Sequence, residues 1–284
     1  MAQVNTCGAR ISSVEDYLSQ ADEIYNSLFC NIAKGSRCEL WYRGQVRSDF
    51  VLLPRIGRPP LHCELEVVYL SKFKSMAIPF VQMLPAFPLP GGDPPYWSWL
   101  VIMQHYGVPT RLMDWTRYAL AALYFATNPA DPARTSGSDG AVWILNPVIL
   151  NQAFDFNPGL KPGYIPNMEE AEFTSQFGRE SPPHADGKPA AAIGPLNSTN
   201  IVAQRGVFTV FPHQKKLTAL EKLPDSSDYL FKICVASESF DRIQTQLMHY
   251  GVTNLALFPD LGNIAGEITL QVLNEGVIAA VTRK

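Results

Sequence analysis

The chain has 284 residues, of which 46% are hydrophobic and 17% are charged, and its formal net charge is −3 at pH 7. This composition is typical of a globular protein and excludes a disordered, collagen-like or coiled-coil chain. The near-neutral charge also argues against broad non-specific binding to nucleic acid or to an anionic membrane surface, although it leaves room for a local basic groove.

The N-terminal residues lack the basic and then apolar pattern of a signal peptide, and no apolar stretch is long enough to cross a bilayer. We therefore expect a cytoplasmic protein with no membrane partner. The odd number of cysteines, five, and the lack of a Cys-x-x-Cys pair predict reduced thiols. No His/Cys cluster has the spacing of zinc ligands, so we expect no metal.

Helical periodicity, together with Gly and Pro residues at helix ends, predicts the longer helices. They cover residues 12–34, 63–80, 96–106, 117–128, 238–250 and 261–274. The segment 117–128 is apolar almost all round, which predicts a largely buried helix.

Short apolar runs predict the strands. These are 39–45, 141–145, 229–235, 255–258 and 201–211, the last as a strand pair or a bulged strand. Pro-rich and Gly-rich segments predict loops at 46–60, 84–95 and 129–140, and residues 150–198 are the least regular part. The irregular order of helices and strands predicts an α+β fold with small mixed or antiparallel sheets flanked by helices.

No break in the sequence resembles a linker, so we expect a single folded domain. Residues 1–38 are predicted to form a helical preface. The domain itself is predicted to span 39–270, with an irregular insertion at about 150–198. Residues 271–284 are predicted to form a C-terminal tail packed on the domain.

The first group of residues that could carry chemistry lies at 41–45, with the sequence Trp-Tyr-Arg-Gly-Gln. Arg43 at a strand end, followed by Gly44, places a fixed cation beside backbone that a ligand can approach closely. That arrangement suits a phosphate, a pyrophosphate or a carboxylate. The alternative is an Arg43 that pairs with a core carboxylate such as Asp114.

The second group lies at 104–116, between two apolar helices, where Gly107 and Pro109 enforce a turn. Burying its polar side chains is costly unless they bond to each other or to a ligand. These side chains are Gln104, His105, Thr110, Arg111, Asp114 and Thr116. The segment is either the floor of a ligand site or a structural knot, in which Asp114 caps the helix at 117 and pairs with Arg111 or Arg43.

The third group is Gln204-Arg205-Gly206, where a polar residue begins an apolar run and Gly206 permits a bulge. A plain bulged edge strand is the alternative. In addition, Arg47, Arg55 and Arg58 form a basic loop near Arg43, which either contacts phosphate or is solvated.

Taken together, these segments resemble the FRG domain family over roughly residues 40–268. The matching motifs are Tyr42-Arg43-Gly44, Leu52-Leu53-Pro54-Arg55, the run from Gln104 to Thr116, the helix at 122–126, and the run from Gln204 to Thr209. The run from Gln104 to Thr116 is the most specific of them.

The family in turn resembles, distantly, the ADP-ribosyltransferases, which implies a fold of that kind. In those enzymes an aromatic-Arg-Gly or aromatic-His-Gly strand grips NAD, and a second strand with Ser or Thr leads into a helix. A later strand carries the catalytic Glu. Arg43 matches the first position and Asp114–Thr116 the second. Asn200 or Gln204 stands at the third, where Glu is expected.

The resemblance implies an enzyme that uses NAD to modify a macromolecule, either RNA, DNA or protein, as a bacterial toxin or anti-phage effector would. An antitoxin or chaperone would then be a further partner. The catalytic residues implied are Arg43, His105, Asp114, Thr116 and Gln204. The implied NAD-binding residues are Tyr42, Arg43, Gly44, Gln45, Gln104, Tyr106, Thr110, Arg111 and Trp115.

The missing Glu matters because an amide can hold a ribose hydroxyl but adds no negative charge. The loss of such a group commonly costs about 10²–10³ in rate. Asp114, Glu170, Glu172 or Glu180 would have to replace it. Two alternatives therefore stay open. One is a non-catalytic module that binds a nucleotide or a partner, and the other is a nucleotide hydrolase or nuclease with Asp114 and His105 as acid and base.

Overall fold

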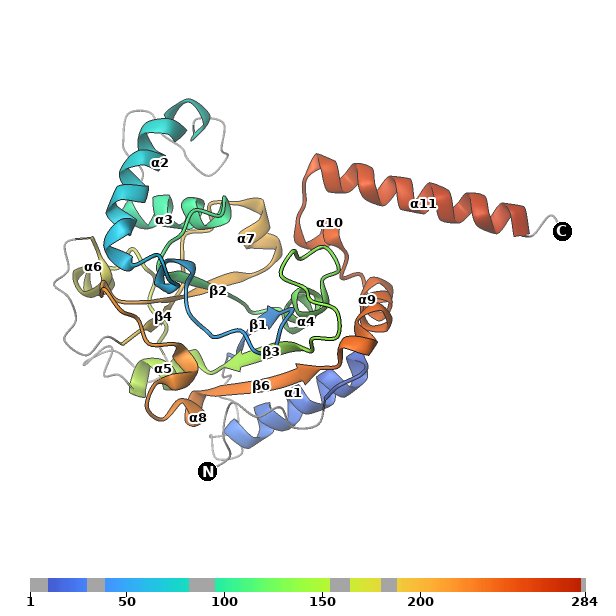
Figure 1. Cartoon of the computed structure of the whole chain (residues 1–284), viewed down its shortest axis with the longest axis horizontal. Coiled ribbons are helices and arrows are strands. Elements are labelled where there is room, and N and C mark those ends of the chain that lie inside the picture. Colours follow the sequence, from blue (N-terminus) through green and yellow to red (C-terminus); the bar gives the residue numbers. More distant parts are fainter. Residues whose placement is uncertain (1–9, 30–38, 82–94, 154–163, 180–187, 282–284) are drawn as a thin grey trace.

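The computed structural model describes residues 10–29, 39–81, 95–153, 164–179 and 188–281, with side chains described as far as residue 273. Within these residues six strands form one antiparallel sheet in the order β4-β5-β2-β1-β3-β6 (Figure 1). The strands are β1 (Trp41–Gln45), β2 (Leu112–Thr116), β3 (Gly140–Leu145), β4 (Ala190–Ala192), β5 (Gly206–Val210) and β6 (Leu230–Val235). The mixed class of helices and antiparallel strands is confirmed, with one sheet in place of several small ones.

The six longer helices lie close to their predicted positions. They are α1 (Val14–Phe29), α2 (Glu66–Val81), α3 (Tyr96–His105), α4 (Ala119–Thr127), α9 (Phe240–His249) and α11 (Leu261–Val281). Shorter helices occur at α5 (Pro147–Ala153), α6 (Ala171–Phe177), α7 (Thr199–Ala203), α8 (Ser226–Tyr229) and α10 (Asn254–Leu257). The segment 150–198 is therefore partly regular. The predicted loop at 84–95 lies almost wholly outside the described residues.

The predicted strand at 255–258 is wrong and the one at 201–211 forms only in its second half, as β5, because a side chain caps a helix at the start of each segment. The Ser198 hydroxyl accepts a hydrogen bond from the backbone N–H of Ile201, which starts α7 where the sequence predicted the beginning of a strand at 201. The Thr253 hydroxyl accepts one from Ala256 N–H and starts α10 at the predicted strand 255–258. Such capping satisfies backbone donors that the first turn of a helix leaves free.

A third difference concerns the polar segment 104–116, which was expected to be a turn between two helices. Its second half forms the central strand β2. β2 pairs with β5 along five positions, from Leu112–Val210 to Thr116–Gly206. Asp114 therefore lies on the sheet and does not cap the next helix. The N–H of Tyr118 is instead bonded to the Thr116 hydroxyl.

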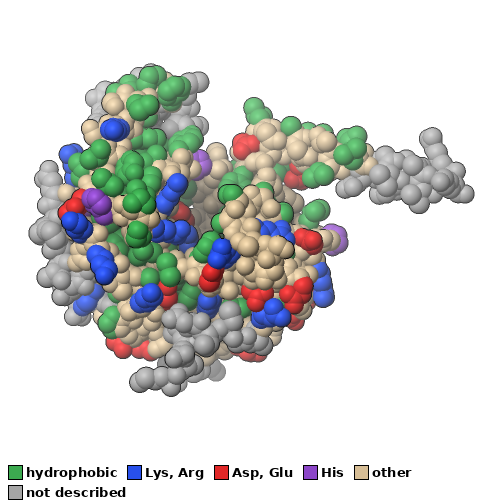
Figure 2. Space-filling view, viewed as in Figure 1, with side chains coloured by type: hydrophobic (Ala, Val, Ile, Leu, Met, Phe, Trp, Pro, Cys, Tyr) green, Lys and Arg blue, Asp and Glu red, His purple; other side chains and the backbone are tan. Residues whose placement is uncertain are grey.

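The last helix, α11, extends away from the sheet (Figure 1), and Figure 2 shows hydrophobic side chains along its surface. Residues 271–273 are exposed. The side chains that follow lie outside the described part of the chain, so the packing of 271–284 on the domain stays a prediction. No helix among the described residues has both the length and the apolar character needed to span a membrane. Cys63 is buried and free, whereas Cys234 is disulfide-bonded, so the expectation of reduced thiols is wrong for Cys234.

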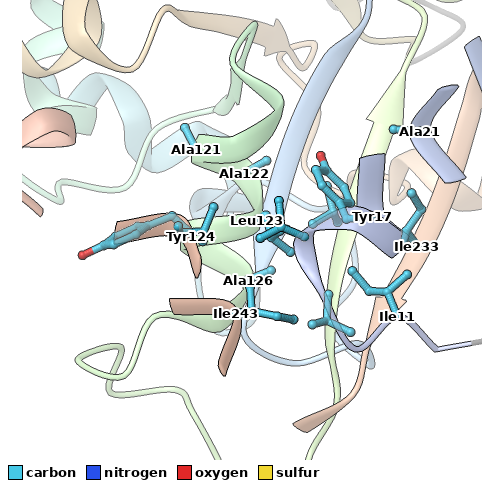
Figure 3. Close-up of a cluster of buried hydrophobic side chains, with 14 of the residues drawn as sticks. Ile11, Tyr17, Ala21, Ala121, Ala122, Leu123, Tyr124, Ala126, Ile233 and Ile243 are labelled. Carbon is cyan, nitrogen blue, oxygen red and sulfur yellow. The ribbon is translucent and has the colours of Figure 1, made fainter. Parts of the chain in front are cut away.

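The helix α4 fixes the position of β1, because it packs directly on that strand. Figure 3 shows α4 side chains, such as Ala122 and Leu123, among those of α1 and β6. A Cβ atom on Gly44 would lie 1.9 Å from the carbonyl oxygen of Ala122, so only glycine allows this approach. Side chains alternate along a strand, which puts Arg43 on the face opposite Gly44.

Next to the contact between Gly44 and α4, strands β1 and β2 move apart. In the described ladder, β1 and β2 share the pair Tyr42–Thr116, while β1 and β3 share five pairs from Trp41–Leu145 to Gln45–Ala141. The Arg43 Nη1 atom donates to the backbone oxygen of Asp114 on β2, at 2.6 Å. An arginine side chain thus bridges two strands whose backbones have separated.

Candidate functional site

A cleft of about 420 Å³ lies where β1 and β2 separate, and we name it the arginine cleft. Its polar lining comes from Arg43, Arg55, Arg58 and Gln104, and its apolar lining includes Leu53 and Met113. Arg55 is carried by a 3-10 turn, η1 (Arg55–Gly57). Arg55 and Arg58 belong to the basic loop that the sequence predicts near Arg43, and both line the cleft together with Arg43. In the space-filling view, Lys and Arg side chains gather around a hollow in the displayed face (Figure 2).

Backbone carbonyls hold all three arginines of the cleft. Arg55 Nη1 donates to the Gly107 oxygen at 2.6 Å, and Arg58 donates to the Leu53 oxygen from Nε at 3.1 Å and from Nη2 at 2.9 Å. Within the described part of the chain, none of the three forms an ion pair with a carboxylate. Their positive charges are therefore fixed in place, and among the described residues no carboxylate lies within ion-pair distance of them.

The surroundings of Arg43 and Arg58 show that these charges are crowded. Burial lowers the pKa of Arg43 more than the nearby Asp114 raises it. Burial, with the charge of Arg55, lowers the pKa of Arg58. Both guanidinium groups stay charged at neutral pH, and the Nε of Arg43 is buried with no hydrogen-bond partner among the described residues. A phosphate or carboxylate in the cleft would pair with these guanidinium groups and relieve the repulsion between them.

A second hollow of about 220 Å³ adjoins the first, and we name it the polar pocket. Gln104 lines both spaces. The polar residues of the pocket are Gln104, His105, Asp114, Asn200 and Gln204. The structure thus brings four of the sequence-predicted residues, Gln104, His105, Asp114 and Gln204, to one place beside Arg43.

Gln104 is held from both ends of its amide. The Thr110 hydroxyl donates to Gln104 Oε1 at 2.6 Å, and Gln104 Nε2 donates to Asp114 Oδ2 at 2.7 Å. These two hydrogen bonds fix the orientation of the Gln104 amide and of the Asp114 carboxylate. Gln204 Nε2 donates to the Leu257 oxygen at 3.1 Å.

Asp114 is the carboxylate of the site. Among the described residues that line the arginine cleft or the polar pocket, it is the only acidic one. Burial lowers the pKa of His105, and Asp114 opposes that shift, so the imidazole is neutral at pH 7. Glu170 accepts hydrogen bonds from Tyr164 and from Asn167 N–H, Glu172 lies in the first turn of α6, and Glu180 is outside the described residues.

Several residues expected at the NAD site lie elsewhere. Tyr42 packs against the hydrophobic cluster around α4. Gln45 is buried and accepts a hydrogen bond from Trp143 Nε1 at 2.8 Å. Trp115 is buried as well, with its Nε1 donating to the Thr209 hydroxyl at 3.1 Å. The Thr116 hydroxyl donates to the backbone oxygen of Gln204. In the structure these side chains pack in the cores beside the sheet or form hydrogen bonds within it.

Arg111 is also structural. It is fully buried, and its Nε donates to Glu66 Oε2 at 3.0 Å, while its backbone N–H donates to Glu66 Oε1 at 2.9 Å. Its other donors reach the oxygens of Phe211 and Tyr96. The carboxylate partner thus comes from α2 and not from Asp114, which leaves Asp114 available to the polar pocket.

A third space, of about 540 Å³, lies on the other side of His105, and we name it the neutral pocket. His105 and Tyr106 line it from the end of α3, and Leu196, Asn197 and Val202 line it from α7 and the segment before it. Tyr106 was among the predicted ligand residues, whereas none of the residues at 196–202 that line this pocket was predicted. The run Asn197-Ser198-Thr199-Asn200, a cluster of polar residues ahead of a strand, was the available signal.

The fold and the site together define an α+β domain with an arginine-lined cleft at an opening in its sheet. Residues 38–135 match the model of the FRG domain family, which supports the predicted family. The match covers about a third of the chain and includes Arg43, Arg55, Arg58 and the segment 104–116. Searches of curated proteins and of solved structures found no match. The described residues contain no group of three or more His, Cys, Asp or Glu that could hold a metal.

Proposed function

We propose that this protein binds NAD across the arginine cleft and the polar pocket and transfers its ADP-ribose to a macromolecule. The observation that carries the proposal is the set of three guanidinium groups held by backbone carbonyls, directly beside a pocket that contains one carboxylate. A pyrophosphate brings two negative charges to such a cleft and accepts several charge-assisted hydrogen bonds.

The placement of the motifs supports the same reading. Arg43 lies on β1, and Asp114–Thr116 lies on β2, which leads into α4. Gln204 ends α7 and lies two positions before β5. The three strands are neighbours in the order β5-β2-β1, so the three motifs that the ADP-ribosyltransferase resemblance assigns to NAD meet at one edge of the opening. An ADP-ribosyltransferase-like fold is part of this proposal.

The reaction breaks the C–N bond between nicotinamide and ribose, and nicotinamide leaves with the electron pair. The ribose carbon becomes oxocarbenium-like, as in glycoside cleavage. The Asp114 carboxylate stabilises that positive charge, and the Gln204 or Asn200 amide bonds a ribose hydroxyl. The acceptor forms the new bond to the ribose carbon, and neutral His105 takes the proton that the acceptor loses.

A second candidate is a non-catalytic nucleotide-binding module. It is favoured by Gln204, which stands ahead of β5 where the resemblance expects a carboxylate and which is already bonded to the Leu257 oxygen. In that case the arginine cleft holds the nucleotide and Asp114 only orients Gln104.

The test is to measure binding of NAD and ADP-ribose by calorimetry, and turnover with NAD labelled in its adenylate phosphate. The label is followed into protein, RNA and DNA. We expect Arg43→Ala to weaken both ligands by about 30-fold or more, because it removes a partly buried charge partner. Arg47→Ala is the matched control, since Arg47 is already paired with Asp49 at 2.6 Å.

Asp114→Asn separates binding from chemistry. We expect it to retain NAD binding and to lose about 10²–10³ in turnover. Binding without turnover in the wild-type protein would select the non-catalytic module, and free ADP-ribose as sole product would select a hydrolase. A wild-type protein that binds neither NAD nor ADP-ribose overturns the proposal.

A further inference from the structure

We propose that the neutral pocket binds a nucleobase of a nucleic-acid acceptor and presents it to the polar pocket. The inference rests on the proposed function in naming the occupant an acceptor. The evidence for the binding site comes from the residues that line the neutral pocket.

The neutral pocket adjoins the proposed reaction site at one shared side chain. His105 lines both the neutral pocket and the polar pocket, and the polar pocket contains Asp114. The donor phosphates are assigned to the arginine cleft, which adjoins the polar pocket through Gln104. Gln104 and His105 are consecutive at the end of α3. A group in the neutral pocket therefore approaches the polar pocket from the side opposite the donor phosphates.

The lining selects an uncharged, flat occupant. No Lys, Arg, Asp or Glu occurs among the described residues that line the pocket. A charged acceptor such as an arginine or a carboxylate would lose its hydration there without gaining a partner. Tyr106, 60% exposed, offers an aromatic face beside the His105 ring, at 4.9 Å between centroids. Leu196 and Val202 are exposed apolar residues on the other wall. Aromatic faces of this kind bind bases by stacking.

The side-chain oxygen of Asn197, which lines this pocket, is a buried acceptor without a donor among the described residues. Asn197 is 6% exposed, and its Nδ2 donates to the Ser98 oxygen at 3.0 Å, which fixes Oδ1 as the acceptor end of the amide. That Oδ1 is buried and has no hydrogen-bond partner among the described residues. An unsatisfied buried acceptor is costly, and ring or exocyclic N–H groups of a base supply the missing donor. A base offers the flat face and the N–H together.

In the transfer step, a base nitrogen or oxygen that faces His105 forms the bond to the ribose carbon of NAD. The bond from that carbon to nicotinamide breaks, and nicotinamide leaves with the electron pair. The proton released from the base passes to His105, so charge and atoms balance.

The experiment measures binding of fluorescein-labelled eight-nucleotide single strands of DNA and RNA, one set for each base, by fluorescence anisotropy without NAD. We expect Tyr106→Ala and Val202→Glu to weaken binding about tenfold, because they remove the stacking face and place a charge in the pocket. Tyr250→Ala and Val68→Glu are the matched controls. Both positions are exposed, lie outside the three spaces, and should change binding less than about twofold.

Calorimetry of the same variants with NAD completes the test, with unchanged affinity as the expected result. Equal weakening of NAD and oligonucleotide would make the pocket part of the donor site and overturn the proposal. So would wild-type protein that binds no oligonucleotide, variants that bind like their controls, or a tryptophan-containing peptide that binds where oligonucleotides do not. If NAD fails to bind while oligonucleotide binding still depends on Tyr106 and Val202, the proposed function fails and the base site stands.

Discussion

Two helices of this protein end in the same four residues, His-Tyr-Gly-Val, at 105–108 after α3 and at 249–252 after α9. The two ends have the same backbone geometry. Gly107 and Gly251 both have φ of 76°, in the left-handed region. The N–H of Val108 reaches back to the Met103 oxygen at 2.8 Å, and that of Val252 reaches the Leu247 oxygen at 2.8 Å. This is the closure expected when glycine follows the last turn of a helix.

Their surroundings differ completely. At the α3 end, His105 and Tyr106 line pockets, and Arg55 donates to the Gly107 oxygen. At the α9 end, the Tyr250 hydroxyl donates to exposed Glu15 on α1 at 3.3 Å. A Cβ on Gly251 would meet no atom within 4 Å. The same tetrapeptide therefore builds the same helix end twice, and only the neighbours brought by the fold turn one of them into a site.

The largest expected difference is between a buried carboxylate beside the first turn of α3 and an exposed carboxylate beside the end of α9. Glu66→Ala leaves Arg111 buried without its carboxylate partner, next to Tyr96, so we expect a loss of about 3–5 kcal/mol in the free energy of unfolding. Glu15→Ala removes an exposed carboxylate beside the α9 end and should cost less than about 0.5 kcal/mol. Denaturant unfolding of both variants measures the contrast, and equal losses would contradict it.

The next effect is a pH dependence that arises beside the Glu66–Arg111 pair and not at the end of α9. Burial, together with the charge of Arg111, lowers the pKa of His213 to about 4, while Glu66 at 3.7 Å opposes that shift. As the pH falls, the unfolded chain binds this proton at a higher pH than the folded chain does. The contribution of His213 to stability is therefore constant above about pH 6.5 and decreases as the pH drops toward 4. The expected loss is about 3 kcal/mol.

Urea unfolding at pH 7 and at pH 4.5 measures this dependence. His213→Gln should flatten it, whereas His249→Gln, at the exposed end of α9, should leave it unchanged. A wild-type slope that survives His213→Gln would assign the dependence to other groups.

The smallest effect concerns the two glycines. Gly107→Ala and Gly251→Ala both force a Cβ into the left-handed region, so we expect each to cost about 1 kcal/mol of stability. The new Cβ at Gly107 makes only an ordinary contact with Arg55 Nη1, at 3.7 Å, but a backbone shift there would move the carbonyl oxygen that accepts from Arg55 Nη1 at 2.6 Å. We therefore expect Gly107→Ala to weaken ADP-ribose binding a few-fold and Gly251→Ala to leave it unchanged, as measured by calorimetry. Equal binding by the two variants would separate the helix end from the arginine cleft.

Patterns of residues close together in the sequence predicted most of the helices and strands. Helix ends and strands such as β1 and β3 depend on bonds between residues a few positions apart or on a short apolar run, and the sequence shows both. The motif Tyr42-Arg43-Gly44 likewise pointed to Arg43 as a fixed cation, but the backbone at Gly44, which was expected to face a ligand, is covered by α4. The errors at α7 and α10 arose because single hydroxyl caps outweighed an apolar pattern of only a few residues.

The partners of the polar residues depended on contacts between distant segments, which no local pattern records. Arg111 pairs with Glu66, 45 positions earlier, and not with Asp114. Trp115 and Gln45 turn inward to bond Thr209 and Trp143. Asn197 meets Ser98 across 99 positions. Polar side chains gain free energy from whichever complementary group the packed chain brings within hydrogen-bond distance, so only the tertiary structure separates the residues bonded inside the fold from those that line the pockets.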